Sequence, residues 1–238
     1  MVKLDAVRES ADAGPMTDDA ARLREALTDD ESHAARVHFA RTTMEAIEHV
    51  GGVLHLTGHV LGDDAAAGVS VATRIGGALA RGACDLLDAG NAYAAAALVR
   101  QLVEVEYLLW TFTDDPQDAV RWLSASRSQL DKHFTPKAMR ERSNGVFRAE
   151  EYRRHCNTGG HPDPTGATFL LGWEQSVPAL WADLGQHVEH VWNLLVRATY
   201  LIERAETIEP RAEAVFDALN GWRERDPWAF REPFPDDG

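Results

Sequence analysis

One stretch of the sequence, "AEEYRRHCNTGGHPDPTG" at residues 149–166, carries most of the side chains that could do chemistry. Arg154 and His161 have six residues between them, and Asn157 is one of the six. A histidine can move a proton at neutral pH, and an arginine can bind a phosphate through parallel N–H donors. The pair therefore suits phosphodiester cleavage, with Asn157 able to orient the phosphate or the imidazole. The alternative is that the glycines and prolines of this stretch simply form a turn with His161 exposed.

The charge beside this stretch is opposite in sign to that of the chain. The 238 residues carry a formal net charge of −14, which argues against a protein that coats nucleic acid. Residues 132–154, however, hold seven basic side chains against three acidic ones. The segment indicates either a local phosphate-binding site or a solvated helical face.

Two histidine pairs have spacings that could bind a metal. His55 and His59 lie four residues apart in "HLTGH", and His187 and His190 lie three apart in "HVEH". A metal site needs three or four converging ligands, and no Glu-x-x-His motif accompanies either pair. We expect satisfied or surface histidines and no metal, with a metal-bound bundle using His55 and His59 as the minor alternative.

Other signals narrow the class of protein. Gly-x-Ser-x-Gly, Walker A and Gly-x-Gly-x-x-Gly motifs are all missing, so no cofactor is expected. There is no apolar run long enough to span a membrane and no apolar signal core at the N-terminus. Cys84 and Cys156 lack metal-like spacing and fit a reducing compartment, so a cytoplasmic location is predicted.

Helical periodicity dominates the chain, and strand signals are nearly missing. We predict an all-α protein, an up-and-down bundle of four long helices with additional short helices and an irregular C-terminal tail. The long helices are expected near residues 32–61, 65–88, 91–113 and 177–205. The helix over 91–113 is apolar nearly all round, and its one charged strip carries Arg100 and Glu104. These two should pair with each other or with a group from elsewhere.

Three regions are expected along the chain. Residues 1–30 read as an acidic arm with a short helix, and residues 31–205 as the helical bundle domain. Further short helices should start near Asp115, where "DDPQDAVRWLSASRSQL" reads as one helix, and near Thr135 and Ala149. Residues 206–238 read as a C-terminal helix and a proline- and aromatic-rich tail that packs on the body or on a partner.

Two motifs carry a resemblance to a known family. With "LVRQLVEVEYLLW" on a central helix and "YRRHCNTGGHP" before the last long helix, the chain resembles the HEPN superfamily over roughly residues 35–205. More narrowly, it is similar to bacterial helical proteins with a Leu-x-Arg-x-Leu-x-Glu helix and a late Tyr…His-Pro loop. Active members of that family are metal-independent ribonucleases with an Arg, four to six residues, then a His.

The resemblance implies a function and a set of site residues. It implies a homodimeric endoribonuclease of a toxin–antitoxin or phage-defence system, with RNA as substrate and a cognate protein or antitoxin as partner. The implied catalytic residues are Arg154, His161, Asn157 and Glu104; Arg100, Arg148, Arg153 and His155 are the expected substrate-binding residues. The alternative is a non-catalytic dimeric helical module that binds a protein partner or a nucleotide.

Overall fold

The computed structural model describes residues 18–160, 164–170 and 176–230, and every regular element in them is helical. The prediction of an all-α protein is therefore confirmed for this part of the chain. His161 lies outside the described residues. No helix among the described residues is long and apolar enough to cross a membrane.

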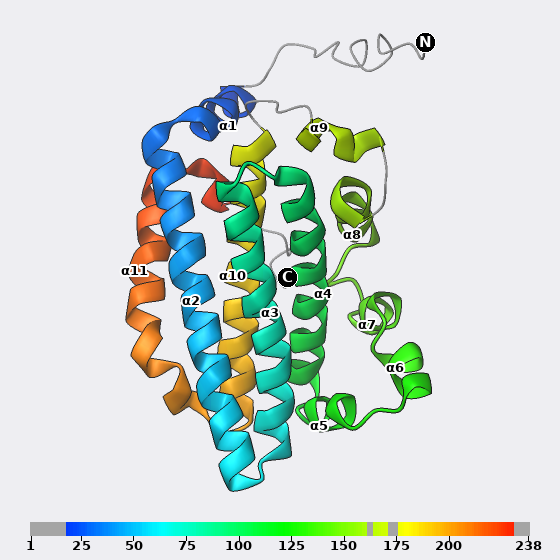
Figure 1. The fold of residues 1–238 in the computed structure, drawn as a ribbon. Coiled ribbons are helices and arrows are strands. Elements are labelled where there is room, and N and C mark those ends of the chain that lie inside the picture. The colour runs from blue at the N-terminus through cyan, green and yellow to red at the C-terminus, as the bar shows by residue number, and fades with distance from the viewer. Residues whose placement is uncertain (1–17, 161–163, 171–175, 231–238) are drawn as a thin grey trace.

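Four long helices make up most of the body (Figure 1). They are α2 (Asp30–Leu61), α3 (Asp64–Asp88), α4 (Ala92–Asp114) and α10 (Ser176–Leu201). α3 packs between α2 and α4, and α10 packs against α4 and α2. α11 (Glu209–Arg225) covers the outer face of α2.

The directions of the long helices depart from simple alternation. α2, α3 and α4 alternate, but α10 runs in the same direction as α4 (Figure 1). An ion pair between Arg204, just after α10, and Asp63, in the turn between α2 and α3, agrees with this direction at 2.6 Å. The chain returns from the end of α4 to the start of α10 through a series of short elements on one side of the body.

Those short elements include the described part of residues 149–166. They are α5 (Gln117–Leu123), α6 (Arg127–His133), α7 (Pro136–Arg142), α8 (Ala149–His155), the π-helical turn η2 (Cys156–Gly160), the 3₁₀ turn η3 (Pro164–Gly166) and α9 (Ala167–Leu170). The prediction of a single helix across residues 114–130 is wrong. It is divided into α5 and α6, because Ser126 and Gln129 form a capping box that starts a new helix.

Local signals explain the helix ends. The carboxylates of Asp29 and Asp63 cap α2 and α3 by accepting hydrogen bonds from backbone N–H groups at 2.7 and 3.0 Å. The long helix α10 ends at Leu201, four residues earlier than expected from the sequence. Glu203 has a φ of 58°, a left-handed conformation that ends a helix.

The described part of the C-terminal segment, up to residue 230, packs on the body. Trp222 of α11 is fully buried and stacks on Phe39 of α2 with ring centroids 4.8 Å apart. Trp228, in the 3₁₀ turn η5 (Pro227–Phe230), donates its indole N–H to the Leu23 carbonyl of α1 (Asp18–Thr28) at 2.8 Å.

Candidate functional site

A cleft of about 790 Å³ lies between α8 with its following π turn and the first half of α10. Its lining includes polar and charged side chains from α8 and η2 on one side and Asp183 and Gln186 of α10 on the other. Trp228 of η5 contributes one edge of the cleft. The stretch predicted to do chemistry therefore forms one wall of a cavity.

Three arginines line this cleft: Arg148, Arg153 and Arg154. Arg154 lies 3.8 Å from an Asp183 oxygen and keeps more than half of its side chain exposed. Among the described residues, neither Arg148 nor Arg153 forms an ion pair. Burial raises the pKa of Glu151, which lines the cleft together with two further carboxyls, Glu150 and Asp183. Arg148 and Arg153 are therefore the cationic groups of the cleft that are available to an anion.

The π turn brings the backbone of the cleft wall against α4. Thr158 donates its hydroxyl hydrogen to the Arg154 carbonyl at 3.0 Å, which continues the path of α8 by one wider turn. A Cβ on Gly159 would lie 2.2 Å from the Ala96 carbonyl carbon of α4. The missing side chain of Gly159 therefore allows close approach of the neighbouring helix.

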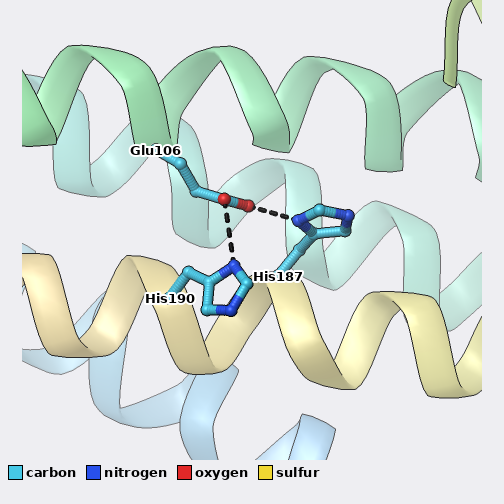
Figure 2. Close-up of side chains that lie close together, drawn as sticks. All are labelled: Glu106, His187 and His190. Atoms are coloured by element: carbon cyan, nitrogen blue, oxygen red, sulfur yellow. Dashed lines mark hydrogen bonds and ion pairs between the residues drawn. The ribbon is translucent and has the colours of Figure 1, made fainter. Parts of the chain in front are cut away.

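A buried cluster of one carboxylate and two imidazoles lies behind the cleft (Figure 2). Glu106 of α4 accepts a hydrogen bond from His187 Nδ1 at 2.5 Å on one oxygen, and its other oxygen lies 3.1 Å from His190 Nδ1. Both histidines come from α10, one turn apart, and both point at the same carboxylate. All three side chains are buried.

His155 of α8 connects this cluster to the cleft. Its Nε2 lies 2.9 Å from His187 Nε2 and 3.4 Å from an oxygen of Asp183. His155 is buried, whereas a quarter of the Asp183 side chain is exposed in the cleft wall. A continuous path of polar atoms therefore runs from the cleft through Asp183, His155 and His187 to Glu106.

The surroundings shift the proton affinities of these groups in opposite directions. Burial lowers the pKa of His155 to about 4, so this imidazole is neutral at pH 7. Burial acts in the same direction on His187, but the Glu106 carboxylate outweighs it and raises the pKa of His187 to about 9. Burial also disfavours the Glu106 anion, yet His187 and His190 hold the pKa of Glu106 below its ordinary value.

Arg100 and Glu104 form a separate polar group with Tyr152. Arg100 donates to a Glu104 oxygen at 2.6 Å, and the Tyr152 hydroxyl donates to the same oxygen at 2.7 Å. The expectation that the two charges pair on the α4 helix is confirmed. Neither residue is among those that line the cleft in the described part of the chain.

The structure places the described members of the predicted site in two regions. Arg148, Arg153, Arg154, His155 and Asn157 line the cleft, with His155 at its buried floor. Arg100 and Glu104 lie apart from it, and His161 falls outside the described residues. The cleft thus brings together five of the eight predicted residues.

Glu106, Asp183, His187 and His190 form the polar interior, and of these only the histidines had been considered from the sequence. Glu106 follows the apolar Leu102 by four residues and precedes Leu109 by three, so it lies on the buried seam of α4. A carboxylate on such a seam requires a buried cationic or hydrogen-bonding partner. The pair in "HVEH", on another core helix, was the available partner, and that signal could have identified the cluster.

The other histidine pair offers no comparable arrangement. His55 and His59 are both exposed on α2. Within the described residues, groups of three potential metal ligands occur only around His187: Glu106 with His187 and His190, and His155 with Asp183 and His187. Cys84 is buried, Cys156 is partly buried, and the two thiols are not joined in a disulfide.

Comparison of the chain with protein-family models, with curated proteins and with solved structures gives no match in any of the three. The site is therefore interpreted from its own residues and geometry.

Proposed function

We propose that this protein is a HEPN-like endoribonuclease that cleaves RNA in the cleft between α8 and α10. The observation that carries the proposal is the set of arginines in the cleft: Arg148, Arg153 and Arg154 line one cavity beside three carboxyls, in a chain with a net charge of −14. Clustered arginines provide the forked donors that phosphate oxygens accept. A role in a toxin–antitoxin or phage-defence system, with a cognate protein partner, is the corresponding biological proposal.

The chemistry needs proton transfer and charge stabilisation, both of which protein side chains can supply. His161 would accept the proton of the ribose 2′-hydroxyl as its oxygen bonds to phosphorus. The bond from phosphorus to the 5′-oxygen breaks, that oxygen would take the proton now held by His161, and a 2′,3′-cyclic phosphate remains. Arg154 would stabilise the extra negative charge on the phosphoryl oxygens, and Asn157, also in the cleft wall, would orient the phosphate. No metal takes part in this attack.

Cleavage of a labelled single-stranded RNA by the purified full-length protein tests this proposal. We expect Arg154→Ala to lower the rate roughly 10²- to 10³-fold, since one charge-stabilising group is lost, and His161→Ala to lower it at least as much. Arg127→Ala is the matched control, because Arg127 is an exposed arginine of α6 that pairs with Asp131 outside the cleft. A substrate with 2′-deoxyribose at the cleavage position should resist. Cleavage of that substrate, or full activity of Arg154→Ala, would refute the mechanism.

The second candidate is a non-catalytic dimeric helical module, and a specific surface favours a dimer. Large apolar side chains are exposed where α2 and α10 end, near the Arg204–Asp63 ion pair: Leu56, Val60, Leu61, Tyr200 and Leu201. Exposed apolar patches of this kind mark interaction surfaces. In both candidate functions the four long helices serve as a bundle scaffold. A second copy of the chain covers the exposed apolar side chains at the ends of α2 and α10. A monomeric mass by light scattering would contradict the dimer, and robust RNA cleavage would refute the non-catalytic module.

A further inference from the structure

We propose that His155, Asp183 and His187 bind one divalent transition-metal ion, with zinc as the best-fitting ion. The inference does not rest on ribonuclease activity, because it uses neither Arg154 nor His161 as a ligand. The three side chains come from two elements: His155 ends α8, and the other two lie four residues apart on one face of α10. Together they offer two imidazole nitrogens and a carboxylate.

The three donor groups lie close to the separations of a tetrahedral site. His155 Nε2 and His187 Nε2 share a hydrogen bond at 2.9 Å, and each faces a different oxygen of Asp183, at 3.4 and 3.7 Å respectively. Ligands at 2.0–2.1 Å from a tetrahedral zinc are separated from one another by roughly 3.3 Å. An ion would therefore replace the hydrogen bond between the imidazoles, move the two rings slightly apart and bind one Asp183 oxygen.

Glu106 prepares His187 for this role. Its carboxylate accepts the Nδ1 hydrogen of His187, so that a metal ion displacing the Nε2 proton would find a lone pair on the far side of the ring (Figure 2). A carboxylate that holds the second nitrogen of a ligating histidine is the usual outer support of a zinc site. His190 contacts the other Glu106 oxygen at 3.1 Å and so holds the carboxylate in place.

The neighbouring trio of Glu106, His187 and His190 fits a metal less well. The Glu106 oxygen and His187 Nδ1 are 2.5 Å apart, the distance of a short charge-assisted hydrogen bond and well below a tetrahedral ligand separation. The Glu106 and His187 side chains are also almost completely buried, and neither is among the residues that line the cleft. The site with Asp183 does border the cleft, so an ion can enter and a water can complete its coordination.

The donor set also selects the class of metal. Two imidazoles and one carboxylate suit zinc, cobalt and similar first-row ions, whereas magnesium and calcium require oxygen ligands. A bound ion would join the end of α8 to α10 directly beside Arg154. It would thereby fix the wall of the cleft, a role separate from the cleavage chemistry.

Metal titration of the chelator-stripped full-length protein tests the inference. Calorimetry with Zn²⁺ should show one equivalent bound, and Co²⁺ should give the visible absorption of a tetrahedral site. His155→Gln and Asp183→Asn each remove a proposed ligand and should weaken Zn²⁺ affinity by more than about 100-fold. That factor is the largest loss typical of removing a residue that only hydrogen-bonds to a ligand. Glu106→Gln should weaken it by roughly 10- to 100-fold. His55→Ala, which alters an exposed histidine, is the matched control and should bind as the wild type does.

Several results would overturn the inference. The inference fails if neither ion binds saturably, or if His155→Gln leaves the Zn²⁺ affinity unchanged. It also fails if His190→Gln removes binding while His155→Gln does not. Circular dichroism of the metal-free variants shows whether each is folded, and Asp183→Asn, at a partly exposed position, guards against misfolding of the His155 variant. Arg154→Ala should keep its metal affinity, so failure of the ribonuclease proposal is distinguishable from failure of this one.

Discussion

The Glu106 carboxylate lies in the interior with an imidazole nitrogen against each of its oxygens. Glu104, two residues earlier on the same helix, binds Arg100 and Tyr152 with about a third of its side chain exposed. The two glutamates therefore have similar chemistry and different surroundings. A charge removed from water is expensive unless it is paired, so the buried carboxylate depends much more on its partners than the exposed one.

This difference predicts unequal effects of the same substitution. Glu106→Gln keeps the size of the side chain and removes the charge that balances His187, so we expect a loss of about 3 kcal/mol in the free energy of unfolding of the metal-free protein. Glu104→Gln breaks a partly solvated pair and should cost less than about 1 kcal/mol. Urea denaturation of both variants measures the two values. Equal losses would show that the buried cluster contributes no more than a surface ion pair.

The sequence allowed only part of the site to be predicted at the scale of residues. Arg154 and Asn157 were recognised from their types and spacing, and both line the cleft. Glu106 was overlooked because a single polar residue among apolar neighbours has no spacing motif of its own. Its partners come from α10, more than 80 positions away, and only the packing of the two helices reveals them.

At the scale of elements, the π turn after α8 is held against α4 by a glycine. A Cβ on Gly159 would lie 2.2 Å from the carbonyl carbon of Ala96. Any larger residue would therefore force the π turn to move away from α4. That movement would shift the cleft wall, since Asn157 and Thr158 belong to the same turn. The position of the candidate site therefore depends on close contact between two backbones.

Alanine substitutions at two glycines test this contact. We expect Gly159→Ala to destabilise the fold by about 1–3 kcal/mol, because the added methyl group meets backbone atoms that cannot rotate away. The control is Gly52→Ala in α2, where a Cβ would have no atom within 4 Å. It should stabilise by about 0.5–1 kcal/mol, since alanine favours a helix interior. Thermal unfolding of both variants gives the comparison, and a neutral Gly159→Ala would show that the turn can move at little cost.

Element boundaries were predictable where a cap or an apolar seam marked them. The long helices begin and end within a few residues of the expected positions because their caps are local: Asp29, Asp63 and Asn91 each accept a hydrogen bond from the helix that follows. The division between α5 and α6 was missed, since the capping box at Ser126 lies inside a continuous polar pattern. The parallel course of α4 and α10 was missed as well, because direction depends on the connecting segment rather than on periodicity.

At the scale of the whole molecule, one buried arginine joins segments from both ends of the chain. Arg36 of α2 donates to the Ala26 carbonyl of α1, to the Pro178 carbonyl of α10 and to the carboxylate of Asp226. Asp226 also accepts the indole N–H of Trp222 at 2.8 Å. The Arg36 and Asp226 side chains are completely buried. This network attaches the C-terminal segment to the body beside the cleft, because Trp228, whose backbone N–H donates to Asp226, is one of the cleft residues.

Asp226→Asn therefore tests whether the C-terminal segment stabilises the entire fold. The change leaves the Arg36 guanidinium buried without an anion, so we expect a loss of about 3–5 kcal/mol in the free energy of unfolding. Asp88→Asn is the matched control, because Asp88 pairs with Arg41 while nearly half of each side chain is exposed, and it should cost less than about 1 kcal/mol. Urea unfolding followed by both circular dichroism and tryptophan fluorescence should give one coincident transition for the wild type. If Asp226→Asn instead separates the two signals, with fluorescence changing first, the C-terminal segment unfolds on its own and the network only anchors it locally.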